Sequence, residues 1–281
     1  MTFVVNLNNF KHQNSSLYMK KFKIYIVFIV IFCLPQFSIA WGTLGHKVVG
    51  QIAESYLTPK ANTAIKDILG DETLAKASIW ADFVKSDPSF NYLNNWHYIN
   101  FKEGLSEKDM KAYLETDTAT GAYTKVNFLV KQLKNKHLEK EKKKLYLRLL
   151  IHIVGDIHQP LHTGREVDLG GSKIKVLWFD KPASLHSVWD EKMIDHQEMD
   201  FIEYSKSINY TTKQQVIQWQ KDPISHWLFQ SYQLAEQLYH EIKVPNEKLS
   251  SSYNKQHIQA ANEQLLKGGV RLAGLLNQIF G

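Results

Sequence analysis

Apolar residues recur with helical spacing through most of the chain after its first 40 residues. In residues 44–57, the side chains of Val48, Ile52 and Tyr56 fall on one stripe, which predicts an amphipathic helix. The same spacing predicts further helices over residues 59–69, 78–85, 121–136, 142–158, 184–196, about 222–242 and 253–279.

Residues that favour helix ends coincide with several of these boundaries. Pro59 suits the first position of its helix, and Gly70 follows the last position of the same helix. Pro160 should stop the helix over 142–158, because proline removes a helical hydrogen bond and its ring clashes with the preceding turn. The clear strand signal is KIKVLWF at 173–179, which predicts one arm of a small hairpin. We therefore expect a mainly α, single-domain, multi-helix protein with a small β-hairpin.

The first 40 residues have a different pattern. Three lysines follow Met19 within four residues, and then come eleven residues of an apolar run over 24–34 and small residues before the end of the segment. This order is typical of a secretory signal peptide, and the apolar run is too short to span a bilayer. We expect an upstream start extension over 1–18, a signal peptide over 19–40 that is cleaved after Ala40, and a secreted or periplasmic domain over 41–281. The alternative for the apolar run is a short N-terminal anchor helix.

The charge balance changes once that segment is set aside. The whole chain has 34 Lys and Arg residues against 28 Asp and Glu residues, and four of the lysines lie in residues 1–40. That leaves 30 basic against 28 acidic residues, a balance that excludes nucleic-acid binding by bulk charge. Cys33, the one cysteine, also lies in this segment, so residues 41–281 contain no disulfides and no thiolate metal ligands. A secreted domain of this kind needs a large core or bound metals for its stability.

Two pairs of histidine and aspartate have the spacing of one helical turn. His152 and Asp156 lie in the run HIVGDIHQPLH, and His186 and Asp190 lie in SLHSVWDEKM. Residues four apart on a helix point the same way, so each pair could chelate one cation. His162 follows just past the proline break, where the chain can turn back toward the same site. One such pair is weak evidence, because many are surface salt bridges, but two pairs with apolar neighbours are stronger evidence.

Two more candidate ligands lie upstream. Asp82 lies in WADFVK and His97 lies in NNWHYIN, in both cases among aromatic and aliphatic residues. Each residue alone is best interpreted as a hydrogen-bonded, half-buried polar side chain. Together with the two pairs and His162, they form a set of imidazoles and carboxylates without cysteine, and such a set suits zinc.

The N-terminus expected after cleavage adds a further possibility. The cleaved chain would begin WGTLGH, and the α-amino group of Trp41 and its own carbonyl oxygen can chelate a metal in a five-membered ring. His46 lies about one helical turn into the chain beside it. The alternative is that Trp41 fills a core pocket and that His46 caps the first helix.

The motifs of the chain occur in the order WG…GH, WAD, WHYIN, HxxxDxHQPLH, GG and HxxWD. This order resembles the zinc-dependent single-strand-specific nucleases of the mung bean nuclease type, also called type I nucleases, whose fold is shared with the zinc phospholipases C. The resemblance covers essentially all of residues 41–281, down to GGVRLAGLLN at 268–277. The missing cysteines, the HTGREVDLGG loop and the KIKVLWF strand look more like a bacterial-type member. The resemblance implies a mainly helical domain that holds three Zn²⁺ in a cleft.

The resemblance also implies a role for each candidate ligand. It implies that the first zinc is bound by Asp82, His97, His152 and Asp156. It implies that the second is bound by His162, His186 and Asp190. It implies that the third is bound by His46, by the bridging Asp156 and by the amino nitrogen and carbonyl oxygen of Trp41. His158 matches a non-ligand position, and we expect it to support the ligands.

Catalytic and substrate-binding residues follow from the same resemblance. Two close metals that share a carboxylate can activate water for in-line attack on phosphorus, and Asp82 could also orient that water. Lys85 matches the basic residue near the scissile phosphate, although it could also be a solvated lysine. Tyr98 matches the base-stacking position, and Asn100 stands where fungal members have an aspartate that reads the base edge. Asp168, in the loop GREVDLGG, borders the same pocket.

These expectations describe a trinuclear-zinc endonuclease that hydrolyses single-stranded DNA and RNA to 5′-phosphorylated products. Removal of the phosphate from 3′-nucleotides is a further expected reaction. We expect a monomer without stable membrane association. The enzymatic alternative is a zinc-dependent phospholipase C, which Trp189 between His186 and Asp190 disfavours because that is the nuclease form. The non-enzymatic alternative is an extracytoplasmic zinc-binding protein that buffers metal.

Overall fold

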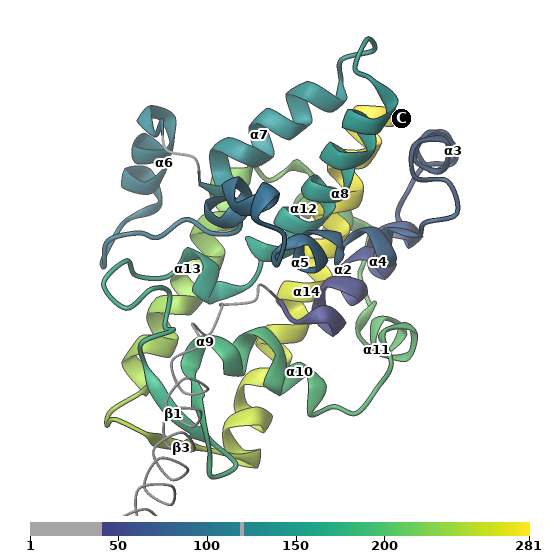
Figure 1. Cartoon of the computed structure of the whole chain (residues 1–281). Helices are drawn as coiled ribbons and strands as arrows, with labels where there is room; N and C mark the ends of the chain where they lie inside the picture. Colours follow the sequence, from purple (N-terminus) through teal and green to yellow (C-terminus); the bar gives the residue numbers. More distant parts are fainter. Residues whose placement is uncertain (1–40, 119–120) are drawn as a thin grey trace, which may run out of the picture. The chain divides into compact units, whose positions relative to one another are not determined.

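The long helix α14 (Ser251–Phe280) forms the centre of the fold in the computed structural model, which describes residues 41–118 and 121–281. It is the yellow helix of Figure 1, and it is contacted by α2 (Thr43–Ser55), α3 (Pro59–Leu69), α8 (Lys140–Asp156) and α12 (Lys213–Lys221). The expected start extension and signal peptide lie outside the described residues.

Small residues allow α2 and α14 to approach each other closely. A Cβ atom at Gly269 would lie 2.5 Å from Cγ2 of Ile52 and 3.0 Å from the carbonyl oxygen of Val49. Ile52 and Val49 are buried, as is Val48 on the predicted stripe of α2. This contact fixes α2, and His46 within it, against the core of the protein.

The helices predicted from periodicity are present, with ends that differ by a few residues. They include α3, α5 (Trp80–Val84), α7 (Ala122–Leu133), α8, α13 (Ile224–Glu241) and α14. In Figure 1, α7 and α8 lie side by side, and contacts between these two helices are extensive. This pairing directs the C-terminal end of α8 toward the interior.

Several short helices have no counterpart in the prediction. They are α4 (Leu74–Ala77), η2 (Pro88–Trp96), α6 (Glu107–Thr116), α11 (Phe201–Ile208) and α12. Helix α12 buries none of its residues fully, and α6 buries only Met110 and Leu114. The apolar stripes of α6 and α12 are therefore too narrow to detect in the sequence. The first turns of these two helices are capped by the side chains of Ser106 and Thr212.

The structure corrects two predicted boundaries near the candidate ligands. Helix α8 ends at Asp156 rather than at residue 158, and Pro160 begins the short 3₁₀ helix η3 (Pro160–Thr163) instead of stopping α8. The helix predicted over 184–196 is divided into α9 (Leu185–Ser187), the π-helical segment η4 (Val188–Lys192) and α10 (Met193–Asp195). Segments of π-helix are rare and occur frequently at functional sites.

The predicted hairpin is present and belongs to a three-stranded sheet. Strand β1 (Lys175–Trp178) pairs antiparallel with β2 (Lys181–Ser184), and Phe179 and Asp180 at the turn have φ angles of 48° and 61°. Strand β3 (Glu247–Leu249) pairs parallel with β1 on its other edge, which gives the order β2-β1-β3. The sequence did not predict β3, because three residues carry too little pattern.

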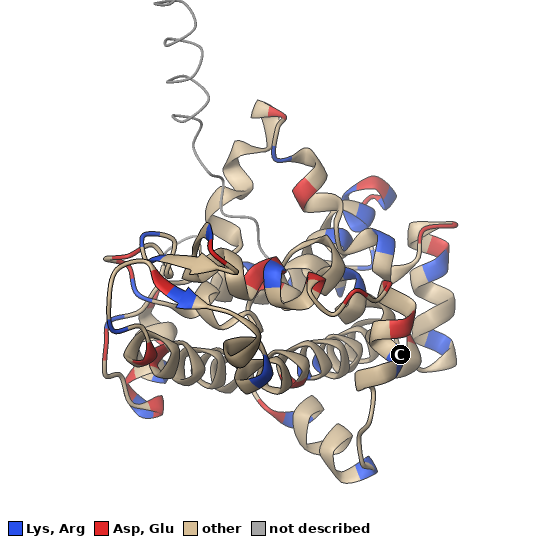
Figure 2. Cartoon of the chain, turned by 90° about the horizontal axis from the view of Figure 1, so that it is seen from below, with Lys and Arg blue, Asp and Glu red and all other residues tan. Residues whose placement is uncertain are grey.

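The described residues thus form the mainly helical fold with a small sheet that the sequence predicted. Basic and acidic residues are interspersed along the helices, as Figure 2 shows. Within the described residues, no helix is both long enough and apolar enough to cross a membrane.

Candidate metal centre and active site

The last turn of α8 places His152 and Asp156 in the interior, where both side chains are fully buried. The helix ends there, and the N–H of Gln159 donates to the carbonyl oxygen of Asp156 at 2.9 Å. The chain then turns through η3, which carries His162. The segment therefore brings its ligand candidates back to one site, as the sequence predicted.

The carboxylate of Asp156 lies at the centre of a first cluster. Its Oδ2 lies 2.9 Å from Nδ1 of His97 and 3.3 Å from Nε2 of His152. Its Oδ1 lies 3.3 Å from Nε2 of His46. Asp82 approaches from α5, with its Oδ1 3.9 Å from Nε2 of His152. Five of the predicted ligands, from four separate segments, therefore meet at one place.

The carboxylate of Asp190 organises a second cluster. Its Oδ2 lies 3.0 Å from Nε2 of His186, and its Oδ1 lies 3.5 Å from Nε2 of His162. The side-chain amide of Gln159 donates to the same Oδ1. Nδ1 of His162 is also 3.8 Å from Oδ1 of Asp156, so the two clusters adjoin.

Backbone carbonyls hold three of the imidazole rings. Nδ1 of His152, His162 and His186 lies within hydrogen-bond distance of the carbonyl oxygen of Ser78 (2.6 Å), His97 (2.8 Å) and Gly170 (2.6 Å), respectively. A carbonyl oxygen only accepts, so each Nδ1 donates, and in the neutral ring Nε2 remains the acceptor that faces a carboxylate. Metal-binding histidines are oriented in this way.

The environment keeps both central carboxylates ionised. Burial raises the pKa of Asp156, but the neighbouring imidazoles of His152, His46 and His97 outweigh burial and hold the pKa well below its ordinary value. Burial also raises the pKa of Asp190, but His186 and His162 bring it down to about 2. Ionised carboxylates in the interior attract a cation.

The imidazoles respond to the same environment in two ways. Burial lowers the pKa of His152 to about 3, although Asp156 opposes that shift. Burial also lowers the pKa of His162, but the neighbouring carboxylates of Asp190 and Asp156 raise it above its ordinary value. His152 is therefore neutral near pH 7, which is the state that a metal ligand requires.

Several buried atoms of the predicted ligands make no hydrogen bond to the described residues. They are both ring nitrogens of His46, Oδ2 of Asp82, Oδ1 of Asp156 and Nε2 of His162. Unpaired buried polar atoms are costly, so such a group of them requires a partner. Ligand atoms on a tetrahedral zinc ion lie about 3.3 Å apart, close to the separations in both clusters. The set of nitrogen and oxygen donors therefore fits zinc.

Trp41 and His46 reach the clusters from the start of the described chain. The N–H of Gly42 donates to the carbonyl oxygen of Asp190 at 2.7 Å, and Trp41 is fully buried. The ring of His46 stacks on that of His152 with centroids 4.0 Å apart. Gly155 makes room for His46, because a Cβ atom there would lie 2.8 Å from its Nδ1. The backbone of Trp41 is thus held beside the second cluster, and His46 lies in the first.

Asp82 and Lys85 lie at the more accessible side of the first cluster. Nζ of Lys85 is 2.6 Å from Oδ1 of Asp82, and their side chains are 21% and 14% exposed, whereas that of Asp156 is fully buried. Burial raises the pKa of Asp82, but the charges of His152, His46 and Lys85 lower it below its ordinary value. A charged lysine therefore lies next to a ligand candidate, where a substrate could reach it.

The three predicted substrate-binding residues have different surroundings. Tyr98 is 40% exposed, and its hydroxyl donates to Oδ1 of Asn95 at 3.1 Å. Asn100 is half-buried. Oδ1 of Asp168 accepts from the N–H of Gly171 at 2.7 Å and from the hydroxyl of Tyr239 at 3.2 Å. Asp168 therefore stabilises its own loop, whereas the ring of Tyr98 is accessible to a substrate.

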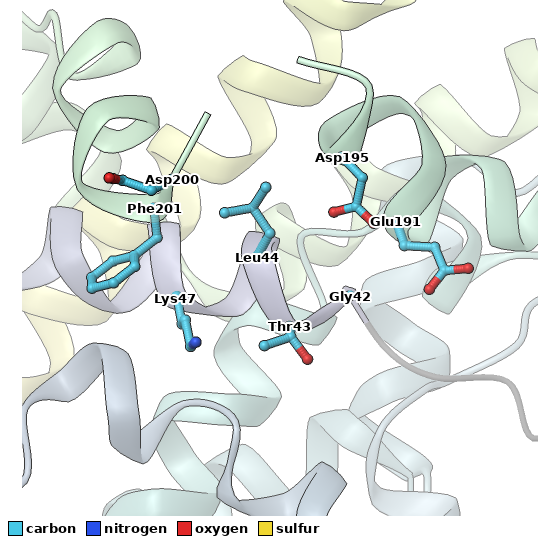
Figure 3. A pocket seen from close by; sticks show the side chains of 8 residues that line it. All are labelled: Gly42, Thr43, Leu44, Lys47, Glu191, Asp195, Asp200 and Phe201. Carbon is cyan, nitrogen blue, oxygen red and sulfur yellow. The ribbon is translucent and has the colours of Figure 1, made fainter. Parts of the chain in front are cut away.

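A surface pocket of about 370 Å³ lies outside the first turn of α2 (Figure 3). It is lined by Gly42, Thr43, Leu44, Lys47, Glu191, Asp195, Asp200 and Phe201. None of the predicted ligands is among these residues. The pocket is therefore separate from the His/Asp clusters, although two of its lining residues, Gly42 and Glu191, directly follow Trp41 and Asp190 in the sequence.

Sequence reasoning did not identify Gln159 and Arg271. Gln159 is fully buried and joins the η3 segment to Asp190 through its side-chain amide. Arg271 is also fully buried and contacts His158 at 3.1 Å, which gives His158 the supporting place that its non-ligand position suggested. Gln159 could have been suspected from its place within HQPLH, but Arg271 had no local signal.

Comparison with known proteins agrees with the resemblance seen in the motifs. The family model described as S1/P1 Nuclease matches residues 41–281. The chain is 27% identical over 280 residues to Endonuclease 3 of Arabidopsis thaliana, covering 92% of this chain and 95% of the relative. It is 28% identical over 268 residues to Nuclease P1 of Penicillium citrinum, covering 86% and 98%. It is 29% identical over 166 residues to Nuclease S1 of Aspergillus oryzae, covering 57% and 56%. The chain therefore belongs to the S1/P1 nuclease family and is a hydrolytic nuclease.

Proposed function

We propose that this protein is a secreted zinc endonuclease that cleaves single-stranded DNA and RNA to 5′-phosphorylated products and also removes the phosphate from 3′-nucleotides. The observation that carries this proposal is the pair of buried His/Asp clusters that adjoin at Asp156. Membership of the nuclease family supplies the reaction class. Secretion rests on the sequence of residues 19–40.

Three Zn²⁺ ions are proposed, held by the residues that the motifs indicated. The ligands are Asp82, His97, His152 and Asp156 for the first ion; His162, His186 and Asp190 for the second; and Trp41, His46 and Asp156 for the third. Zinc bound there would supply Lewis-acid activation of water and of the phosphate group. The buried atoms without hydrogen bonds at His46, Asp82, Asp156 and His162 support this assignment.

Lys85 and Asp82 act on the phosphate and the attacking water. The ammonium group of Lys85 forms a charge-assisted contact with a phosphate oxygen and stabilises charge that develops on it. Water oxygen bonds to phosphorus while the bond between phosphorus and the 3′ oxygen breaks. A carboxylate oxygen of Asp82 accepts a proton from the water, and a proton is returned to the leaving oxygen. The products are a 3′-hydroxyl and a 5′-phosphate.

Preference for single strands follows from the depth of the clusters and from Tyr98. His152 and Asp156 are fully buried, so a phosphodiester must enter the protein to reach them. A stacked duplex cannot bend in this way, whereas a single strand can place an unstacked base on the exposed ring of Tyr98. The base that stacks there positions its phosphate over the clusters.

The decisive experiment uses protein that begins at Trp41. Zinc content is measured by atomic emission, and hydrolysis is followed with denatured DNA, the same DNA as a duplex, RNA, a 3′-nucleotide and phosphatidylcholine micelles. We expect about three zinc ions per chain, cleavage of the single-stranded substrates that EDTA abolishes, and little action on duplex or lipid. Asp156→Ala should lose activity, while Asp71→Ala at an exposed position should keep it.

Other outcomes would select another function. Hydrolysis of lipid but not of nucleic acid would indicate a phospholipase C, and three zinc ions without any hydrolysis would indicate a metal store. Fewer than two zinc ions per chain would contradict the ligand assignment. A chain with one extra residue before Trp41 tests the third site, because it lacks the α-amino group at that position and should be much less active.

A further inference from the structure

The segment that joins Asp82 to His97 presents aromatic and amide side chains to solvent. Its 3₁₀ helix η2 carries Tyr92, whose side chain is 52% exposed. Asn91, Asn94 and Asn95 on the same helix are also exposed. Exposed aromatic rings are few among the described residues, and this one lies between two predicted ligands.

Tyr92 is held in place by other rings. The ring of Trp96 meets it edge-on with centroids 5.6 Å apart, and the ring of Phe90 lies 6.3 Å away at an angle of 33°. Trp96 is buried and packs against Phe128 at 6.5 Å. Tyr92 is therefore anchored to the core on one side while the other side stays accessible. A ring fixed in this way loses little entropy when a ligand stacks on it.

Asn95 lies on η2 between Tyr92 and Tyr98. Residues three apart in a 3₁₀ helix lie above one another, so Tyr92 and Asn95 share one side of η2, about 6 Å apart along its axis. Asn95 accepts the hydrogen bond from the hydroxyl of Tyr98. Tyr98, Asn95 and Tyr92 therefore line the same side of the segment that leads to His97.

The charges around this side suit a polyanion. Residues 88–100 contain no aspartate and no glutamate. Nζ of Lys125 lies 4.5 Å from the ring centroid of Trp96 and 5.6 Å from that of Phe128. Lys85 lies at the other end, beside Asp82. Rings for bases, amides for hydrogen bonds and ammonium groups for phosphates are the chemistry that binds single-stranded nucleic acid.

We propose that Tyr92 is a second base-stacking platform that binds the strand away from the scissile phosphate, with Asn95 and Lys125 beside it. The ligand is single-stranded DNA or RNA longer than a dinucleotide, and the inference rests on the proposed nuclease function. A mononucleotide uses Tyr98 alone, whereas a longer strand uses both rings. This subsite makes the enzyme favour polymers over 3′-nucleotides.

The test compares substrates of different length in Tyr92 variants. The kcat and KM values of zinc-loaded protein are measured with a 3′-nucleotide and with an oligothymidylate of about 15 nucleotides. One stacked base contributes about 1–3 kcal/mol, so Tyr92→Ala should lower kcat/KM for the oligonucleotide about 5- to 150-fold, mainly through KM, and leave kcat/KM for the 3′-nucleotide unchanged. Tyr92→Phe keeps the ring and should behave like the wild type. Tyr210→Ala removes another exposed tyrosine and should have no effect.

Binding is measured separately by fluorescence anisotropy with a phosphorothioate oligothymidylate that resists cleavage. Weaker binding by Tyr92→Ala but not by Tyr92→Phe supports the subsite. Equal binding by Tyr92→Ala and the wild type overturns it, as does an equal loss of activity toward both substrates, which would indicate a structural role. Wild-type protein that cleaves neither substrate refutes the proposed function, and the binding comparison still decides whether Tyr92 contacts the strand.

Discussion

The buried guanidinium group of Arg271 lies 3.1 Å from Nε2 of His158. Nδ1 of His158 donates to the carbonyl oxygen of Val154 at 2.7 Å, so Nε2 accepts from Arg271. Burial and the charge of Arg271 hold the pKa of His158 well below its ordinary value. Arg271 also donates to Asp222 at 3.1 Å and to Gln230 at 2.7 Å. Helix α14 is therefore tied to the turn that carries the candidate ligands.

Replacing Arg271 by alanine should destabilise the protein strongly. The substitution leaves Nε2 of His158 without its donor and removes the ion-pair partner of the largely buried Asp222 carboxylate, and removing one partner of a buried ion pair costs about 3–5 kcal/mol. Urea unfolding of the zinc-loaded protein measures this loss. Lys248→Ala is the control, because its pair with Asp180 is mostly exposed and should not affect unfolding. Equal unfolding free energies for Arg271→Ala and the wild type would show that the network contributes nothing.

Gly155→Ala should displace His46 and weaken one metal site. The new Cβ atom would lie 2.8 Å from Nδ1 and 3.2 Å from Cε1 of His46. His46 is fully buried against the ring of His152, so it cannot move away without leaving Asp156. We expect a loss of about one zinc ion per chain, although alanine favours the helix by about 1 kcal/mol.

The control for that experiment is Gly268→Ala in α14. There the nearest atoms to the new Cβ, in His158 and Val49, lie at an ordinary contact distance of 3.4 Å. This variant should retain the zinc content of the wild type. Full zinc content in Gly155→Ala would mean that His46 is not a ligand or that its ring adjusts without loss.

Asp156 and Asp190 should differ in the number of metals that they hold. Asp156 contacts His46, His97 and His152 and also lies 3.8 Å from His162, whereas the carboxylate of Asp190 contacts two of the predicted ligands, His162 and His186. Asp190 is a ligand of one proposed zinc and Asp156 of two, so Asp190→Ala should retain about two zinc ions and Asp156→Ala about one when dialysis removes each zinc that has lost a carboxylate ligand. Metal analysis after dialysis gives the counts. The same count for both variants would refute a bridging role for Asp156.

Removal of zinc should lower thermal stability in proportion to the number of sites. A ligand at about 100 times its Kd stabilises the folded state by about 2.7 kcal/mol per site, and for a domain of this size each kcal/mol raises Tm by about 2–4 °C. Calorimetry in EDTA and in excess zinc should therefore differ by about 5–10 °C for each site. Magnesium, which prefers oxygen ligands, is the control cation and should not restore Tm. An unchanged Tm in EDTA would show that the clusters are stable without metal.

The parts of the site that the sequence predicted are those fixed by local geometry. His152 with Asp156 and His186 with Asp190 are four residues apart, and helix geometry alone brings each pair together. The positions of Asp82, His97 and Trp41 depend on packing between distant segments, and only the resemblance to a known family placed them. Figure 1 shows how α2, α5 and α8 converge in the fold to achieve this.

The contacts that the sequence did not predict are long-range or depend on space. Arg271 meets His158 only because α14 crosses the end of α8, and no periodicity reports such a crossing. The need for Gly155 depends on the position of His46, which lies on another helix. The end of α8 was also predicted two residues too late, because the pattern could not show that Pro160 starts a short 3₁₀ helix.

Acid should unfold the zinc-free protein more readily than neutral solution does. His152 has a folded-state pKa of about 3 against an ordinary value of 6.5, so the unfolded chain binds a proton first and stability falls as pH drops from about 6.5 toward 3. Asp190, with a pKa of about 2 against 3.8, adds a further loss as pH drops from about 3.8 toward 2. His162 opposes the trend, because its raised pKa stabilises the fold at lower pH. Tm in EDTA should therefore decrease between pH 7 and pH 4, and His152→Gln should reduce that decrease. A Tm that stays constant over this range in the wild type would show that His152 is not held neutral by burial.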